Sequence, residues 1–184
     1  MTSTDHAIRR SATPTEATSA SDTAAWMWAA PLGAALACIA AGTIQLTNPE
    51  FTDVDPANDS AFLAVLVVTI VSFHAVRRVA GGSAWPAWLA TGGISLIAAG
   101  VVVGLVQGSD VEWFFALAGP GLLAWLAASI TLAIRAWRTR TLPRWCLPIF
   151  ALQVPVVVIA ANAGGALVGA VMWMAVAHRI ARRA

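Results

Sequence analysis

The chain has 184 residues, of which 59% are hydrophobic and only 11% are charged, and its formal net charge is +2. Water-soluble domains carry roughly 25% charged residues, so this composition excludes an ordinary soluble globular protein. Lipid must be the solvent for most of the surface, and we expect the lipid bilayer, and no nucleic acid, as the partner of this chain.

Residues 1–23 form a tail that is rich in Ser, Thr and Ala and holds both acidic and basic residues. The tail lacks the apolar core close behind a basic start that a secretory signal needs. It also lacks the apolar content that a packed fold needs, so we expect residues 1–23 to be a disordered cytoplasmic tail.

Apolar segments fill the rest of the chain, and four of them have the roughly 20 residues that a helix needs to cross a bilayer. The uncharged stretch 146–177 would be roughly 48 Å long as one straight helix, against about 30 Å for the hydrocarbon core. Either it tilts and overshoots, giving five spans, or it turns back at Asn162 to Gly165, giving six. The predicted spans are 24–46, 61–79, 85–107, 113–134, 146–162 and 165–180.

The arginines favour six spans over five. All eleven basic residues are Arg, and the cytoplasmic ends of spans are rich in basic residues. With six spans, every arginine falls on the side of the N-terminal tail, and the acids from Glu50 to Glu112 fall on the other side. Trp137 and Trp145 then lie at the inner interface, as in an aromatic belt. The sequence predicts an all-α, multi-pass helical bundle in the plasma (cytoplasmic) membrane, with both termini cytoplasmic.

The sequence offers little for catalysis. No Asp, Glu or Arg lies inside a predicted span, and there is no Lys to form a Schiff base with a cofactor. The zinc-protease, serine-hydrolase and phosphate-loop motifs are also missing. We therefore expect no catalytic residue, no cofactor and no metal ion, and we interpret the protein as not an enzyme.

The few polar residues inside the spans are the candidates for a polar cavity. Gln153 lies two residues before Pro155, which frees a backbone carbonyl; it either lines a cavity or hydrogen-bonds a neighbouring helix. His74 and His178 lie at similar depth and could ligate haem or a metal, or they extend to the headgroups with the adjacent arginines. The cavity candidates are Gln153, Asn162 and His74.

Small residues recur at four-residue spacing, a pattern that lets helix backbones approach closely in a membrane. This strip serves either packing within the monomer or contact in a homo-oligomer. We expect Gly93, about three turns from Gly104, to lie off the strip. The helix-packing candidates are Gly100, Gly104, Gly108, Gly165 and Gly169.

The segment Leu132-Ala-Ile-Arg-Ala-Trp-Arg-Thr-Arg-Thr-Leu-Pro-Arg-Trp145 resembles the central linker of a group of uncharacterised six-span actinobacterial integral membrane proteins. In that group a span ends in a short basic stretch, and Leu-Pro-Arg-Trp opens the next span. The resemblance implies a six-span layout and carries no activity with it.

Two hypotheses of function follow. The first is a non-enzymatic structural, interaction or regulatory membrane protein, with a homo-oligomer or another membrane protein as partner. The alternative is a small-molecule permease or the membrane substrate-binding unit of a transporter. The lack of buried charge and of a nucleotide motif favours the first, and the sequence does not identify a small-molecule ligand.

Overall fold

The computed structural model of the chain describes residues 14–47, 55–108, 113–160 and 163–183. The helices are α1 (Pro14–Thr47), α2 (Pro56–Ala80), α3 (Trp85–Gln107), α4 (Phe114–Arg138), α5 (Cys146–Ala151), the π-helix η1 (Pro155–Ile159) and α6 (Gly165–Ala181). These ranges hold no β-strand. Four helices, α1 to α4, are long and apolar enough to cross a membrane, and α6 is a shorter apolar helix. The predicted all-α membrane bundle is therefore confirmed.

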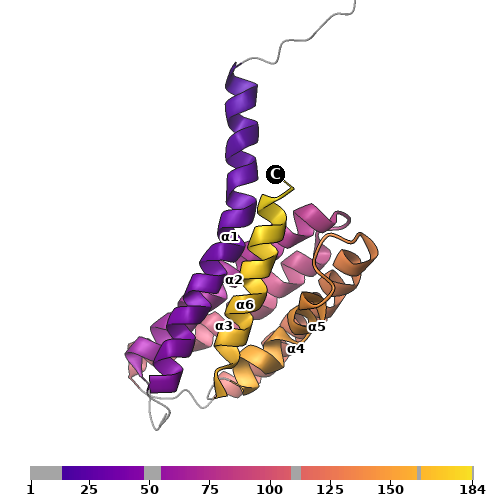
Figure 1. Ribbon diagram of the computed structural model, residues 1–184. Coiled ribbons are helices and arrows are strands. Elements are labelled where there is room, and N and C mark those ends of the chain that lie inside the picture. Colours follow the sequence, from indigo (N-terminus) through magenta and orange to yellow (C-terminus); the bar gives the residue numbers. More distant parts are fainter. Residues whose placement is uncertain (1–13, 48–54, 109–112, 161–162, 184) are drawn as a thin grey trace, which may run out of the picture.

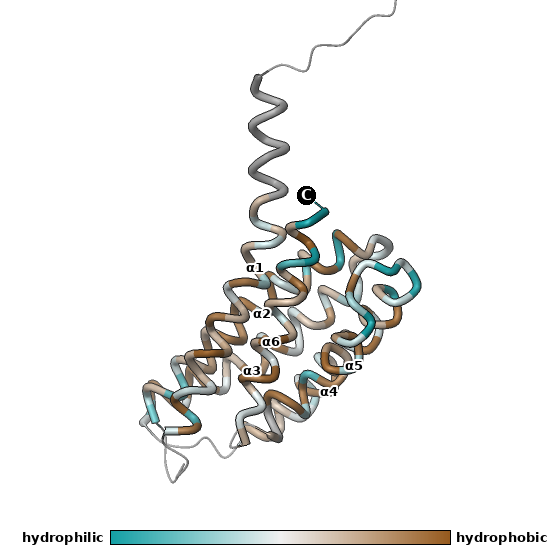
Figure 2. Tube along the Cα trace, viewed as in Figure 1, coloured by the Kyte–Doolittle hydropathy of each residue, from teal (hydrophilic) through white to brown (hydrophobic). Residues whose placement is uncertain are grey.

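The helices form a ring around one core (Figure 1). Each packs against its neighbours in sequence, α6 closes the ring against α1, and α2 also contacts α4 across the middle. Hydrophobic residues run along the helices, and hydrophilic residues gather at their ends and in the loops (Figure 2). Large apolar side chains such as Leu36, Val67 and Leu123 are exposed on the outside of the ring, which suits a surface in contact with lipid.

Three aromatic rings from three helices fill the centre of the core. Phe73 of α2, Phe150 of α5 and Trp173 of α6 are fully buried, with ring centroids between 5.5 and 6.2 Å apart. Trp173 meets both phenylalanines edge to face, a geometry that the aromatic quadrupole favours. These contacts attach the short helix α5 to the opposite side of the ring.

The first helix is longer than the sequence predicts. α1 begins at Pro14 and so includes residues 14–23 of the tail, while residues 1–13 lie outside the described part. Extending an existing helix needs no new nucleus, and each added residue contributes one backbone hydrogen bond. Proline suits the first turn of a helix, and the following stretch is rich in alanine. α1 therefore projects beyond the bundle, next to the C-terminal end of α6 (Figure 1).

A side-chain cap moves the start of α2. The carboxylate of Asp55 accepts a hydrogen bond from the backbone N–H of Ala57 at 3.0 Å, and Pro56 occupies the first turn. Both features stabilise a helix N-terminus, so α2 begins at Pro56 rather than at residue 61. α4 likewise continues to Arg138 rather than ending at residue 134.

The glycines of the strip predicted on α3 have different roles in the structure. Gly100 and Gly104 are buried, and a Cβ atom on Gly100 would collide with the ring of Phe114 on α4. Gly108 is instead exposed, with φ of 64° and open space around it. It ends the helix in the left-handed conformation that favours glycine. The packing role expected for Gly108 is therefore corrected to that of a C-cap.

α3 and α4 also approach closely at Gly93 and Gly121. A Cβ atom on Gly93 would lie 2.5 Å from the carbonyl oxygen of Gly121, and one on Gly121 would lie 2.6 Å from that of Gly93. The expectation that Gly93 lies off the strip is wrong. Three turns at about 3.6 residues each bring Gly93 onto the same face as Gly104.

The fifth apolar segment is broken rather than continuous. α5 ends at Ala151, and the chain resumes as η1 at Pro155. Proline has no N–H to bond to the preceding turn, and its ring displaces the carbonyl there. The wider turn is visible in the hydrogen bond from the N–H of Ala160 to the carbonyl of Pro155, at 3.1 Å. π-helical turns are rare and are frequently found at functional sites.

The chain reverses between η1 and α6, so that the two segments pack against each other. Gly164 precedes α6 with φ of 80°, and the N–H of Gly165 bonds to the carbonyl of Ala160 at 2.7 Å. A Cβ atom on Gly165 would collide with the carbonyl oxygen of Val156. Gly169 is buried in the same face, where an added Cβ atom would lie 3.2 Å from Val157. Both glycines thus permit close helix packing.

Candidate functional site

Buried polar side chains meet where the fifth segment breaks. Gln153, between α5 and η1, is only 1% exposed. Its Nε2 donates a hydrogen bond to Oγ of Ser129 on α4 at 2.9 Å, and that hydroxyl donates its own proton to the carbonyl of Trp125 at 2.8 Å. Gln153 therefore bonds a neighbouring helix, which is the alternative to a cavity role. Asn162 lies outside the described residues.

Two polar atoms of these residues have no hydrogen-bond partner in the described part of the chain. They are Oε1 of Gln153, an acceptor, and Nε1 of Trp125, a donor, and both are buried. A buried polar group left without a partner costs about 1–3 kcal/mol. We call Gln153, Ser129 and Trp125 the Gln153 cluster. The cluster thus carries one free acceptor and one free donor.

His74 lies in a different part of the bundle. Its Nε2 is 3.0 Å from Oγ1 of Thr91 on α3, and that hydroxyl donates its proton to the carbonyl of Ala87 at 2.9 Å. Because a hydroxyl has one proton, it accepts from His74, whose Nε2 therefore carries the hydrogen. The imidazole also packs edge-on against Trp88, with the centroids 5.0 Å apart. Nothing in these contacts joins His74 to the Gln153 cluster.

The described side chains do not assemble a metal site. No group of three His, Cys, Asp or Glu residues comes together within the described ranges. His178, the other histidine considered as a ligand, lines a cavity beside α6, whereas His74 faces α3. The two histidines therefore contact different elements.

The C-terminal ends of α2, α4 and α6 meet at one end of the bundle, which we call the arginine end. There Nη1 of Arg135 donates to the carbonyl of Ser83 at 2.7 Å, and Nη2 of Arg183 donates to the carbonyl of Arg140 at 2.8 Å. These bonds tie α4 to the α2–α3 turn and α6 to the α4–α5 linker. Asp55 and Asp59 lie at the opposite end, at the start of α2.

A cavity of about 310 Å³ lies between the α4–α5 linker and α6. We call it the cationic cavity, because Arg179 and Arg182 line it beside His178. No described side chain pairs with Arg179 or Arg182. Pro143, Trp145 and Ala175 complete the lining.

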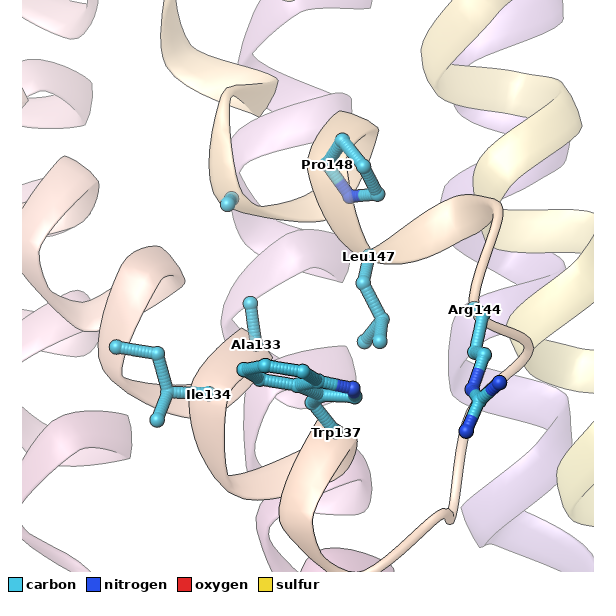
Figure 3. A pocket seen from close by; sticks show the side chains of 7 residues that line it. Ala133, Ile134, Trp137, Arg144, Leu147 and Pro148 are labelled. Carbon is cyan, nitrogen blue, oxygen red and sulfur yellow. The ribbon is translucent and has the colours of Figure 1, made fainter.

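A second cavity of about 320 Å³ lies on the other side of the linker, between α4 and α5 (Figure 3). Apart from Trp137 and Arg144, its walls are hydrophobic, so we call it the apolar groove. It is lined by Ala133, Ile134, Trp137, Arg144, Leu147, Pro148 and Ala151.

No protein-family model, curated protein sequence or solved structure matches this chain.

The sequence singled out Gln153, but neither cavity and neither of the two other members of the Gln153 cluster. Trp125 had a detectable signal, because it lies in the middle of a span, whereas membrane tryptophans concentrate at the interfaces. Its spacing of four residues from Ser129 places both on one helix face. The cavities had no comparable signal, because each is formed by residues from two elements whose packing the sequence does not specify.

Proposed function

We propose that the protein is a non-enzymatic membrane protein that acts as an interaction or regulatory partner at the cytoplasmic face of the plasma membrane. The observation that carries this proposal is the cationic cavity, whose Arg179 and Arg182 have no partner among the described residues. Cations without a counter-charge attract an anionic surface. The expected partner is a membrane protein that presents carboxylates at this depth.

The arrangement of the arginines supports the orientation in this proposal. The described arginines lie at one end of the bundle, and basic residues accumulate at cytoplasmic ends of membrane helices. The six-span group that residues 132–145 resemble would have the same arrangement. Two of the described polar side chains make hydrogen bonds within the bundle: His74 bonds Thr91, and Nε2 of Gln153 bonds Ser129.

Basic residues also keep the ends of membrane helices on the cytoplasmic side, and this role alone would explain the arginines at this end. The test must therefore separate the orientation of the protein in the membrane from recognition of a partner. Lysine keeps the charge and hence the orientation, but it lacks the planar fork with which arginine binds a carboxylate in two places. Replacing Arg179 and Arg182 together by lysine therefore changes recognition alone.

The experiment places a photo-crosslinking amino acid at Trp145 in the full-length protein in its own membrane. Trp113, exposed at the opposite end, is the matched control position. We expect a discrete adduct with one acidic membrane protein from position 145 only, and a several-fold lower yield when Arg179 and Arg182 are lysines. Equal adducts from both positions, or a yield unaffected by the lysines, would refute the proposal.

The Gln153 cluster favours a second function, that of a small-molecule permease. Broken helices with free backbone groups form the substrate sites of many transporters, and here the break carries the unpaired Oε1 of Gln153. If the protein is a permease, proteoliposomes that contain it should swell faster than empty liposomes in solutions of small neutral solutes such as glycerol. The substitution Gln153→Leu should slow that swelling. Identical swelling of loaded and empty vesicles would eliminate it.

A further inference from the structure

The apolar groove has a polar mouth. Ile134 of α4 and Leu147 and Pro148 of α5 form its hydrophobic walls, while Arg144 lies at its edge (Figure 3). The indole ring of Trp137 lies at the same end of the groove, with its nitrogen on the side that faces Arg144 (Figure 3). A cation and a neutral N–H donor thus lie on the same side of a hydrophobic cavity.

The hydrogen-bond donors of Trp137 and Arg144 at this mouth are free within the described part of the chain. Trp137 is 60% exposed, and neither its N–H nor the guanidinium of Arg144 has a hydrogen-bond partner among the described residues. Arginine offers five N–H donors in a planar fork, which matches the oxygens of a phosphate group. The mouth therefore suits an anionic phosphodiester that accepts from both side chains.

The order of groups along the groove follows the order of groups in a phospholipid. Trp137 lies in the last turns of α4, where tryptophan and arginine are typical of the headgroup region. From there the hydrophobic walls run back along α4 and α5, toward the middle of the bundle. A phosphate at the mouth would place an acyl chain against Ile134 and Leu147.

Size and charge narrow the choice of occupant. A cavity of about 320 Å³ is at the small end of ligand pockets, which span roughly 300–1,000 Å³. That volume holds part of one acyl chain but less than one turn of a helix from a second copy, which occupies roughly 400 Å³ at a diameter of about 10 Å and a pitch of about 5.4 Å. Arg144, at the edge of the groove, repels the cationic group of a zwitterionic lipid and favours a lipid with net negative charge.

We propose that the apolar groove binds one anionic phospholipid, with its phosphate on Arg144 and Trp137 and one acyl chain between α4 and α5. This site does not depend on the proposed protein partner. The cationic cavity lies on the other side of the linker and shares none of these residues.

The test is native mass spectrometry of the full chain, released from detergent after titration with phosphatidylglycerol or phosphatidylcholine of the same chain length. We expect one tightly held phosphatidylglycerol, and binding of phosphatidylcholine at least about tenfold weaker. Arg144→Gln should weaken phosphatidylglycerol about tenfold or more, the effect of losing one charged hydrogen bond. Arg138→Gln is the matched control, because it removes the same charge from the same end but lines neither cavity.

A second variant tests the acyl-chain part of the site. Ala151→Phe fills the groove without changing the charge, so it should abolish the tightly held lipid while Arg144 remains. The protein must keep its wild-type melting temperature for this comparison. If Ala151→Phe does not fold, Ile134→Ala, which removes one wall, should instead weaken binding several-fold.

Four results would overturn the proposal. Equal retention of the two lipids would indicate an ordinary lipid annulus. An equal loss in Arg138→Gln would indicate diffuse attraction to the arginine end. Displacement of the lipid by inorganic phosphate would assign the mouth to a soluble anion. A dimer that disappears in Ala151→Phe would assign the groove to a second copy of the chain.

Discussion

Replacing Gly93 by alanine tests the packing of α3 against α4 with a single methyl group. The added Cβ atom would lie 2.5 Å from the carbonyl oxygen of Gly121 and 2.9 Å from Cβ of Ala124. Neither atom belongs to a flexible side chain, so the helices must separate. Overpacking of this kind costs typically about 1–3 kcal/mol.

Gly92 supplies the control for this substitution. It is the neighbouring residue of the same helix, it is exposed, and an added Cβ atom there would meet nothing within 4 Å. Both substitutions improve helix propensity by about 0.5–1 kcal/mol. That gain cancels in the comparison, so Gly93→Ala should be less stable than Gly92→Ala by about 1–3 kcal/mol.

The assay is thermal unfolding of both variants in the same detergent, followed by circular dichroism. One kcal/mol shifts the melting temperature of a chain of this size by roughly 2–4 °C, so the two variants should differ by about 2–12 °C. Gly121→Ala gives an independent test on α4, since its added Cβ atom would lie 2.6 Å from the carbonyl oxygen of Gly93. Equal melting temperatures of Gly93→Ala and Gly92→Ala, with no loss of stability in Gly121→Ala, would show that the helices do not meet at these glycines.

Three further predictions concern orientation, the Gln153 cluster and the hairpin. Reporter fusions should read cytoplasmic at Ala184 and external at Asp55; an external Ala184 would mean five spans. Ser129→Ala should cost about 1–3 kcal/mol in chemical unfolding, because it leaves Nε2 of Gln153 buried without an acceptor, whereas Gln153→Met should cost less than about 1 kcal/mol. A free energy of unfolding that is unchanged in Ser129→Ala would contradict this asymmetry. Gly165→Ala should prevent close packing of η1 on α6 and lower the melting temperature by at least about 2 °C, and an unchanged melt would refute the contact.

The sequence identifies elements of this fold wherever one residue type has one dominant physical role. Long uncharged runs indicate membrane helices, because charge inside lipid is expensive. Two consecutive glycines within the uncharged run 146–177 indicate a reversal, and the structure reverses there through Gly164 and Gly165. These inferences need only the local chain and the bilayer.

Inference from the sequence fails where the outcome depends on a second element. Gly108 and Gly100 have the same spacing pattern, yet one caps α3 and the other packs on Phe114. Pro155 signals a break but does not specify a π-helix. From the sequence, Gln153 could line a cavity or hydrogen-bond a neighbouring helix. The structure decides for the hydrogen bond, because it places Ser129 of α4 beside Gln153. The two cavities depend entirely on how the α4–α5 linker lies against its neighbours.

The broken fifth segment also makes the bundle uneven in height. α5 and η1 together cover residues 146–159, roughly 20 Å at about 1.5 Å per residue. α6, with 17 residues, spans about 25 Å, and α3, whose 23 residues carry no charge, spans about 35 Å.

A bilayer adapts to a short hydrophobic flank by becoming thinner beside it, and this deformation costs a fraction of a kcal/mol for each ångström of mismatch. We therefore expect a depression of the membrane beside the α5–α6 flank and none beside α3. Two depressions that merge deform less lipid than two that stay apart. Membrane elasticity alone then draws this flank toward other proteins of equally short height, before any side chain touches.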